Sequence, residues 1–557
     1  MDENFVLHGP SSPYEPAKGG IGVEIFRAMQ LYKDKIAEFC IETGESSTYG
    51  DFLVRSRRVA MHLLSKKLKK EDTICLCSEN QMNIVLPCLA AKLIDVCYAT
   101  IEPTMPEGDL IYLFEYLKPK VLFVSKTAVD KIEKCLKEAN IKCDVIVFGE
   151  SQKYTSLSDI LIPTPGEEEF NPVWIEDLME TAVIFLSSGT TGKPKGICCN
   201  HYSILSQAIN NALILFRKGI INLSNFSYNI DETENESSEV NVLLYAPFQW
   251  ITGIISLVSA TFMGSTRTIG ACFDVEKVWV AIKKYKPTCM YFAPGQIVDL
   301  YLKRDPNETY DFVDIFITGG GPVKSMHLEY MNEMLPKAVS VQVLGMTENT
   351  GVLSCFRAKD PRTVELQKKY PTSCGELAYG ISCRIVDVDT ESPCSYNQQG
   401  ELRIKSKYLM NGYYKMDSTS CFDADGWFKT GDLAFFNEEG CLTVVDRLKD
   451  ILLYRLYNIR PSVIEEILVK HPAVHQSFII GIPHPQDNEL PMGVVLLKEE
   501  YKNKVTPEEI VEYVNEKVPD DRYKIRAGIK FVDEILRTPS GKIKKIEMKK
   551  LIIDGKL

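Results

Sequence analysis

The sequence predicts an α/β protein with a large, multi-layer N-terminal domain and a small α+β C-terminal domain. The chain has 557 residues, which is more than one simple hydrophobic core can organise. Short runs rich in Val, Ile, Leu and Phe, at residues 121–124, 143–148 and 314–318, alternate with helical stretches at 128–140 and 275–285. This alternation is typical of layered α/β folds with buried, largely parallel strands.

The last part of the chain has a different pattern. From about Lys449 the sequence indicates a separate small unit. Its expected elements are a helix after Pro461, strands at 477–481 and 493–497, and a helix at 506–518. We therefore predict two domains, residues 1–448 and residues 449–557.

Composition excludes several classes of protein. The formal net charge of −11 argues against a nucleic-acid binder, which needs clustered Lys and Arg. The most apolar windows, 83–101 and 251–264, are interrupted by polar residues or are too short for a bilayer, so we expect no membrane span. The acidic N-terminus predicts no presequence, and hence an intracellular chain. The 17 cysteines lack metal-ligand spacing and are expected to be buried, reduced thiols.

A loop rich in Gly, Ser, Thr and Lys follows an expected strand at 181–186. Its residues are Ser187, Ser188, Gly189, Thr190, Thr191, Gly192, Lys193, Pro194, Lys195 and Gly196. Glycines let backbone N–H groups approach phosphate oxygens, hydroxyl groups add donors, and the lysines add positive charge. The spacing differs from the Walker A pattern, because Gly189 and Gly192 are too close together. The loop therefore predicts a polyphosphate site of another kind.

This loop resembles the phosphate-loop signature of adenylate-forming enzymes, which include acyl-CoA synthetases, 4-coumarate–CoA ligases, insect luciferases and the adenylation domains of peptide synthetases. Further segments resemble the motifs of that family in the family's order. They are 318–322 (adenine-binding turn), 345–348 (Y-G-x-T-E motif), 427–432 (ribose-binding motif), 446–450 (hinge) and 537–543 (loop of the catalytic lysine).

The resemblance implies an ATP site and assigns its residues. They are Ser187, Ser188, Gly189, Thr190, Thr191, Gly192, Lys193, Lys195, Gly319, Gly320, Gly321, Gly345, Asp432 and Arg447. A carboxylate at 432 can accept hydrogen bonds from both ribose hydroxyls, and Arg447 is implied as its partner.

The resemblance also implies three catalytic residues, Thr347, Glu348 and Lys542. Glu348 offers a hard oxygen ligand for the Mg²⁺ that accompanies ATP, and Thr347 can donate to the α-phosphate. Lys542 would bridge the substrate carboxylate and the α-phosphate as charge develops.

Four residues are implied for the acyl pocket, namely His201, Trp250, Thr252 and Gly253. Trp250 is the candidate gate, with a core tryptophan as the alternative; for His201 the alternative is a packing role. Apolar neighbours such as Phe248 and Phe262 predict a fatty or aromatic acid as substrate.

Three positions depart from the family pattern. Leu344 replaces the Tyr that stacks on adenine in the family. Leu453 replaces a Lys, and Leu456 replaces a Gly that leaves room for the pantetheine arm of coenzyme A. The prediction of thioester formation therefore rests on fewer matching residues than the prediction of adenylation.

The resemblance thus implies an enzyme that uses ATP and Mg²⁺ to convert a small-molecule carboxylic acid to acyl-AMP and then to its coenzyme A thioester. The C-terminal domain is expected to be mobile, turning about Lys449 between the two steps. Two alternatives stay open: a luciferase-like monooxygenase that oxidises the adenylate with O₂, and a nucleotide-binding pseudoenzyme. The oligomeric state stays open. The C-terminal Gly555-Lys556-Leu557 resembles the peroxisomal address S-K-L, so we expect a cytoplasmic or peroxisomal protein.

Overall fold

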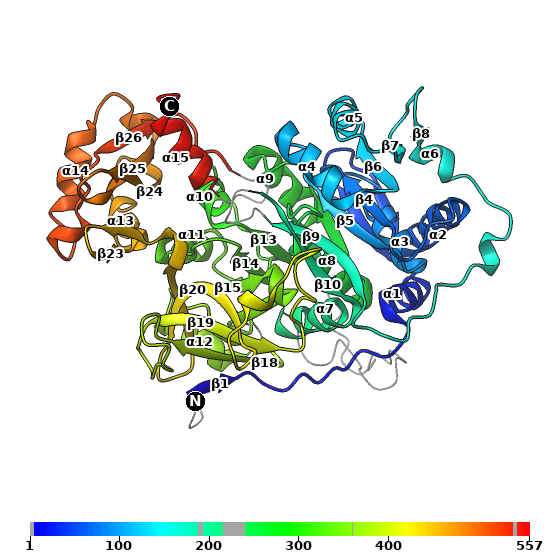
Figure 1. The fold of residues 1–557 in the computed structure, drawn as a ribbon, viewed down its shortest axis with the longest axis horizontal. Coiled ribbons are helices and arrows are strands. Elements are labelled where there is room, and N and C mark those ends of the chain that lie inside the picture. The colour runs from blue at the N-terminus through cyan, green and yellow to red at the C-terminus, as the bar shows by residue number, and fades with distance from the viewer. Residues whose placement is uncertain (1–4, 188–192, 216–239, 359, 538–542) are drawn as a thin grey trace.

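The computed structural model describes residues 5–187, 193–215, 240–358, 360–537 and 543–557. Within these ranges the strands form four sheets, three in a large body and one in a small domain at the C-terminal end of the chain (Figure 1). The predicted α/β class, with its small C-terminal domain, is confirmed.

The first sheet has seven strands in the order β10-β9-β5-β4-β6-β7-β8. Their bounds are β4 (Thr73–Cys77), β5 (Cys97–Ile101), β6 (Val121–Ser125), β7 (Asp144–Phe148), β8 (Thr155–Ser156), β9 (Thr181–Ser187) and β10 (Lys195–Asn200). All neighbours are parallel except β9 and β10. Every residue of β4 and β6 is buried, as expected for a parallel sheet that helices cover on both faces. The covering helices are α2 (Tyr49–Ser65), α3 (Val85–Leu93), α4 (Glu107–Leu117), α5 (Val129–Glu138) and α6 (Leu157–Ile160).

The second sheet has nine strands in the order β17-β16-β15-β14-β13-β11-β12-β2-β3. Their bounds are β2 (Ile36–Cys40), β3 (Ser46–Thr48), β11 (Asn241–Leu244), β12 (Thr266–Ile269), β13 (Cys289–Phe292), β14 (Ile315–Gly319), β15 (Val339–Met346), β16 (Gly351–Cys355) and β17 (Glu376–Leu377). The strands from β2 to β15 in this order run parallel, so their carboxyl ends lie at one edge. Helices α9 (Val275–Tyr285), α10 (Pro294–Leu302) and α11 (Ser325–Met334) pack against it.

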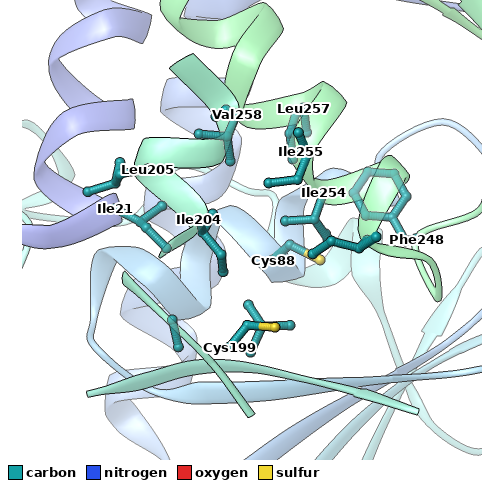
Figure 2. Close-up of a cluster of buried hydrophobic side chains, with 14 of the residues drawn as sticks. Ile21, Cys88, Cys199, Ile204, Leu205, Phe248, Ile254, Ile255, Leu257 and Val258 are labelled. Carbon is teal, nitrogen blue, oxygen red and sulfur yellow. The ribbon is translucent and has the colours of Figure 1, made fainter. Parts of the chain in front are cut away.

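Helices α1 (Gly20–Leu31), α7 (His201–Leu215) and α8 (Ile251–Met263) contribute to the main hydrophobic core. Figure 2 shows part of it, where Ile21, Ile204 and Ile254 meet from these three helices. Packing in this core holds α8 in place. It therefore fixes the backbone position of Trp250, the residue that precedes the helix. The apolar window at 251–264 is thus a buried core helix. No helix in the described ranges is long and apolar enough to cross a membrane.

The third sheet is antiparallel, in the order β1-β18-β19-β20-β21. Its strands are β1 (Val6–His8), β18 (Ile381–Val386), β19 (Gly400–Ser406), β20 (Phe428–Phe436) and β21 (Leu442–Arg447), with α12 (Pro361–Lys369) nearby in the chain. The short turn Leu448–Asp450 then leads into the small domain. The small domain contains β22 (Leu452–Tyr454), β23 (Tyr457–Ile459), β24 (Val474–His484), β25 (Asn488–Leu497), β26 (Ile529–Val532), α13 (Pro461–Leu468), α14 (Pro507–Asn515) and α15 (Lys545–Ile553).

Candidate active site

The antiparallel strands β9 and β10 flank the phosphate-loop segment and form a hairpin. Ser187 pairs with Lys195 across its base. Lys193 Nζ lies 4.6 Å from the centroid of the Tyr112 ring, and Lys195 Nζ lies 5.4 Å from that of Tyr413. Each lysine is thus held beside an aromatic face at the mouth of the hairpin. The predicted phosphate-binding residues Ser188, Gly189, Thr190, Thr191 and Gly192 lie outside the described residues.

Glu348 lies next to this hairpin, in a short turn that follows β15. The Tyr413 hydroxyl donates to Glu348 Oε1 at 3.3 Å, and the same tyrosine ring faces Lys195. Burial, together with the Glu348 carboxylate, raises the pKa of the Tyr413 hydroxyl, which therefore keeps its proton as the donor. Thr347 precedes Glu348, and its carbonyl accepts from Cys199 Sγ at 3.7 Å. The predicted metal residue and the phosphate hairpin thus share one aromatic neighbour.

The expected adenine turn follows β14, where two glycines are required by geometry. A Cβ on Gly319 would lie 2.5 Å from the Val343 carbonyl oxygen, and Gly320 has φ +77°. Gly321 is exposed. Gly345 also lies close to backbone, because a Cβ there would be 3.0 Å from the Gly351 carbonyl oxygen.

Leu344 is half-buried in β15, beside a register shift between Leu344 and Gly345. Its side chain packs against the main core cluster. An aliphatic side chain therefore stands where the family places an aromatic ring.

A cavity joins the adenine turn to the predicted acyl residues. It is lined by Tyr245, Ala246, Trp250, Thr252, Tyr291, Ala293, Gln296, Gly319 and Gly320. Trp250 and Thr252 therefore lie with Gly319 and Gly320 around one space. Gly253 supports the wall from behind, since a Cβ there would lie 2.6 Å from the Pro247 carbonyl oxygen.

Tyr245 and Tyr291 line the cavity although the sequence did not single them out. Tyr245 directly follows β11, and Tyr291 lies near the end of β13. These two strands are parallel neighbours, so their carboxyl ends meet at the edge where α/β proteins bind ligands. A rule that collects aromatic residues at the carboxyl ends of predicted strands would have found both.

His201 does not line this cavity. It begins α7 and is fully buried, with Nδ1 accepting from the Ile21 backbone N–H at 3.2 Å. Its Nε2 lies 3.6 Å from Asp95 Oδ1. Burial lowers the pKa of His201, which favours the neutral ring. The structure thus places His201 in the packing role between α1 and α7.

Asp432 and Arg447 face one another across β20 and β21. They are register partners, and Arg447 Nε lies 2.6 Å from Asp432 Oδ1. Asp432 is buried, whereas the arginine side chain is 47% exposed. The arginine therefore fixes one side of the carboxylate.

Lys542 lies outside the described residues, but both residues that flank residues 538–542 are described. Arg537 and Ile543 pair as an isolated bridge. The Arg537 guanidinium lies against Gly295, where an added Cβ would be 2.8 Å from Nη1. Gly295 stands between the cavity residues Ala293 and Gln296. The two ends of the predicted catalytic loop are thus at the edge of the cavity.

Leu453 and Leu456 belong to the hairpin β22–β23 of the small domain. Leu456 is 93% exposed and Leu453 is 43% exposed. Arg455, at the tip with φ +56°, pairs with Asp487 at 2.7 Å and ties the hairpin to the adjoining strands. In this orientation of the small domain, an apolar side chain therefore projects from the hairpin into solvent.

These features together can hold a nucleotide and a second small molecule. Asp432 offers a hydrogen-bond acceptor, and the glycine turn allows a ligand to approach the backbone closely. Lys193 and Lys195 offer positive charge. The aromatic cavity adjoins the glycine turn and offers an apolar surface. No group of three or more metal-ligating side chains occurs among the described residues, so a metal held here would rely on Glu348 and on ligand oxygens.

Family models match most of the chain. A model described as AMP-binding enzyme matches residues 25–414, and one described as AMP-binding enzyme C-terminal domain matches residues 463–542.

Curated relatives align with the chain along its length. The luciferin 4-monooxygenase of Photinus pyralis is 26% identical over 569 residues, covering 100% of this chain and 98% of the relative. The peroxisomal OPC-8:0-CoA ligase 1 of Arabidopsis thaliana is 26% identical over 561 residues, covering 99% and 97%.

Solved structures show the same fold. The luciferase-like enzyme of the nonluminescent mealworm Zophobas morio has a TM-score of 0.72 and 31% identity, covering 80% of this chain and 100% of that one. The o-succinylbenzoate CoA synthetase of Bacillus subtilis, solved with its acyl-adenylate intermediate, has a TM-score of 0.77 and 21% identity, covering 96% and 99%.

Proposed function

Since the chain belongs to the AMP-binding enzyme family of adenylate-forming enzymes, we propose that it activates a carboxylic acid as its acyl-AMP and transfers the acyl group to coenzyme A. The observation that carries this proposal is the single cavity that brings Trp250 and Thr252 against Gly319 and Gly320, with Arg537 at its edge. An acid and a nucleotide bound there would be neighbours, which is what adenylate formation requires.

The residues fit the roles proposed for them. Asp432 accepts from the ribose hydroxyls while Arg447 holds its other side. Lys193 and Lys195 neutralise phosphate charge. Thr347 donates to the α-phosphate, and Lys542 stabilises the charge that develops as the acid carboxylate attacks the α-phosphorus and pyrophosphate leaves.

Glu348 fits a Mg²⁺ ligand. Its carboxylate is half-buried beside Tyr413, and Tyr413 occupies only Oε1 among the described hydrogen bonds of the side chain. Bound Mg²⁺ would neutralise phosphate charge during the transfer. Gly345 and Gly321 leave room for the nucleotide at the turns that precede Glu348 and α11.

The cavity favours an aromatic or fatty monocarboxylic acid. Its walls carry three aromatic rings, from Tyr245, Trp250 and Tyr291, and no charged side chain. Arg537 lies at the edge of the cavity, so a second substrate carboxylate among these walls would be desolvated without a cation beside it, at a cost of several kcal/mol. We therefore place aromatic acids first and fatty acids second. Gly253 lets α8 lie close to the backbone of Pro247 behind this wall.

The experiment that tests this proposal is an acid panel with pyrophosphate release as readout, with and without coenzyme A. Release with an aromatic or fatty acid, and a thioester product when coenzyme A is present, is the expected result. Light from an added luciferin would move the assignment to the monooxygenase alternative. ATP binding without pyrophosphate release from any acid would favour the pseudoenzyme.

For location we propose the cytoplasm or the peroxisome, resting on the Gly555-Lys556-Leu557 tail. The Lys556 backbone N–H donates to the Leu551 carbonyl oxygen at 2.8 Å, and Leu557 packs against the small hydrophobic cluster around Met548. A receptor would have to free this tail before reading it. Imaging an N-terminal fluorescent fusion with and without the last three residues distinguishes the two locations.

A further inference from the structure

Asp299, in the second turn of α10, faces His475 of the small domain. His475 Nε2 lies 3.4 Å from Asp299 Oδ1. The Asp299 carboxylate also acts on Arg537: burial lowers the pKa of the Arg537 guanidinium, and Asp299 opposes that shift. We call Asp299, His475 and Arg537 the α10 contact. It joins the large domain to the small domain through one acid and two bases.

The α10 contact lies beside the proposed active site. Ala293 and Gln296, at the start of α10, line the cavity, and the Arg537 guanidinium covers Gly295 between them. Arg537 also donates to Gln476 Oε1, next to His475 on β24. The position of α10 and the start of the loop at 538–542 are therefore coupled through adjacent side chains.

A second contact between the domains uses the opposite arrangement of charge. Lys324, before α11, donates to the Glu465 carbonyl oxygen at 3.2 Å in α13. The Glu465 carboxylate accepts from Lys545 at 2.8 Å and from the Ile479 backbone N–H at 2.9 Å. Burial alone would raise the pKa of Glu465, but Lys545 and Lys324 outweigh it and lower the pKa. This contact stays in place if Asp299 is changed, so loss of Asp299 should loosen the small domain without releasing it completely.

We propose that Asp299 is a positioning residue for adenylation: by holding His475, whose neighbour Gln476 accepts from Arg537, it sets the small domain in the orientation in which both ends of the 538–542 loop lie at the cavity. The inference rests on the proposed function. Thioester formation requires the small domain to leave this orientation. Asp299 therefore supports the first half-reaction and has no part in the second.

The test compares Asp299→Asn with Asp130→Asn, the same substitution at an exposed site of α5 in the large domain. ATP–pyrophosphate exchange measures adenylation, and single-turnover transfer from preformed acyl-AMP to coenzyme A measures the second step. Asp299→Asn should slow adenylation about five- to tenfold, the scale of one lost interdomain hydrogen bond, and leave transfer within about twofold. Equal loss in both half-reactions, or unchanged adenylation, would overturn the inference.

A second readout does not depend on activity. Hydrogen–deuterium exchange at residues 293–297 and 475–476 should rise in Asp299→Asn and stay at the wild-type level in Asp130→Asn. His475→Gln should raise exchange at 293–297, and combining it with Asp299→Asn should add little, because both remove the same pair. If the wild-type protein shows no ATP–pyrophosphate exchange but the variants show these changes in hydrogen–deuterium exchange, the proposed function is refuted and the α10 contact stands. If hydrogen–deuterium exchange is unchanged in the variants, the contact itself is refuted.

Discussion

Arg447 Nε lies 2.6 Å from Asp432 Oδ1 across the paired strands β20 and β21. The arginine is half-exposed and the aspartate is buried, so the ion pair orients a carboxylate that water barely reaches. If Asp432 accepts from the ribose hydroxyls as proposed, ordering this acceptor before ATP arrives would reduce the cost of binding the ribose.

Asp432→Asn should raise the KM for ATP about tenfold or more, because a charge-assisted hydrogen bond is lost from a buried position. Arg447→Gln should have a smaller effect of the same kind. Both are measured by pyrophosphate exchange as ATP is varied. Asp425→Asn, at an exposed acid of the preceding turn, is the control and should leave the KM unchanged. An unaltered KM in Asp432→Asn would remove Asp432 from the ribose site.

Lys542→Ala should lower the rate of adenylation by about 10²-fold or more, the scale for losing one preorganised transition-state partner. ATP binding should be nearly unchanged. Stopped-flow turnover and nucleotide titration separate the two quantities. Lys550→Ala, an exposed lysine of α15, is the matched control. If ATP affinity and turnover weaken together, Lys542 acts in the ground state.

Leu456→Gly should speed thioester formation relative to adenylation, because it removes a side chain where the family leaves space for the pantetheine arm. Leu456 is 93% exposed, so the substitution removes little packing in the orientation described here. Single-turnover transfer from preformed acyl-AMP is the measurement, and the adenylation rate of the same variant is its control. A transfer rate equal to that of the wild type would show that Leu456 is no obstruction.

Trp250→Ala should raise the KM for the acid about tenfold or more while leaving the KM for ATP within about twofold, since loss of a large aromatic wall costs ~1–3 kcal/mol. Trp174→Ala removes the same side chain from a site that is 52% exposed and away from the cavity residues. The two KM values come from initial rates of pyrophosphate release. Equal changes in both values would assign Trp250 to core packing.

Glu24→Gln should stabilise the fold at pH 8 by about 2 kcal/mol and change it little at pH 5. Burial raises the pKa of Glu24 to about 7, with Arg27 opposing the shift. The folded state then holds the proton more tightly than the unfolded state. The stability from the protonated carboxyl is full below pH ~4.5 and is lost as the pH rises through about 7.

Denaturant unfolding at the two pH values measures the effect of Glu24→Gln. Glu38→Gln is the contrasting variant, because Glu38 is buried at 2.8 Å from Arg267. Burial raises the pKa of Glu38 to about 7 as well, with Arg267 opposing the shift, so the contrast is read at pH 8: there Glu38→Gln leaves a buried guanidinium without its partner and should destabilise the protein. Similar behaviour of the two variants would contradict the prediction for Glu24.

The resemblance to the family predicted glycines at the expected adenine turn, and the backbone geometry gives a physical reason for them. Gly320 has φ +77°, and a Cβ on Gly319 would collide with a carbonyl oxygen. The wall residues Tyr245 and Tyr291 were missed, although each lies at or near the carboxyl end of a strand, because the order of the strands is what places them side by side. His201 misled for a related reason: it follows the phosphate hairpin in sequence, but the turn into α7 directs its ring toward α1.

The lengths of two strands in the small domain were also underestimated from the sequence. The strands expected at 477–481 and 493–497 are much longer in the structure, as β24 (Val474–His484) and β25 (Asn488–Leu497). Pro483 and Pro491 lie inside them, and proline is normally a sign that a strand ends. Here one long antiparallel hairpin accommodates both, with Pro491 opposite Gly481. Pairing across the hairpin thus overrides this local rule.

The place of β2 in the second sheet has a consequence for synthesis of the protein. Glu38 in β2 meets its partner Arg267 in β12 only across a separation of 229 residues. At about 5–20 residues per second, a ribosome needs roughly 10–45 s to supply that partner. During this time β2 can pair with β3 along one edge, whereas its other edge, which pairs with β12 in the folded protein, has no native strand to pair with. We therefore expect the yield of folded protein to depend on chaperones that bind the nascent chain early in translation, rather than late.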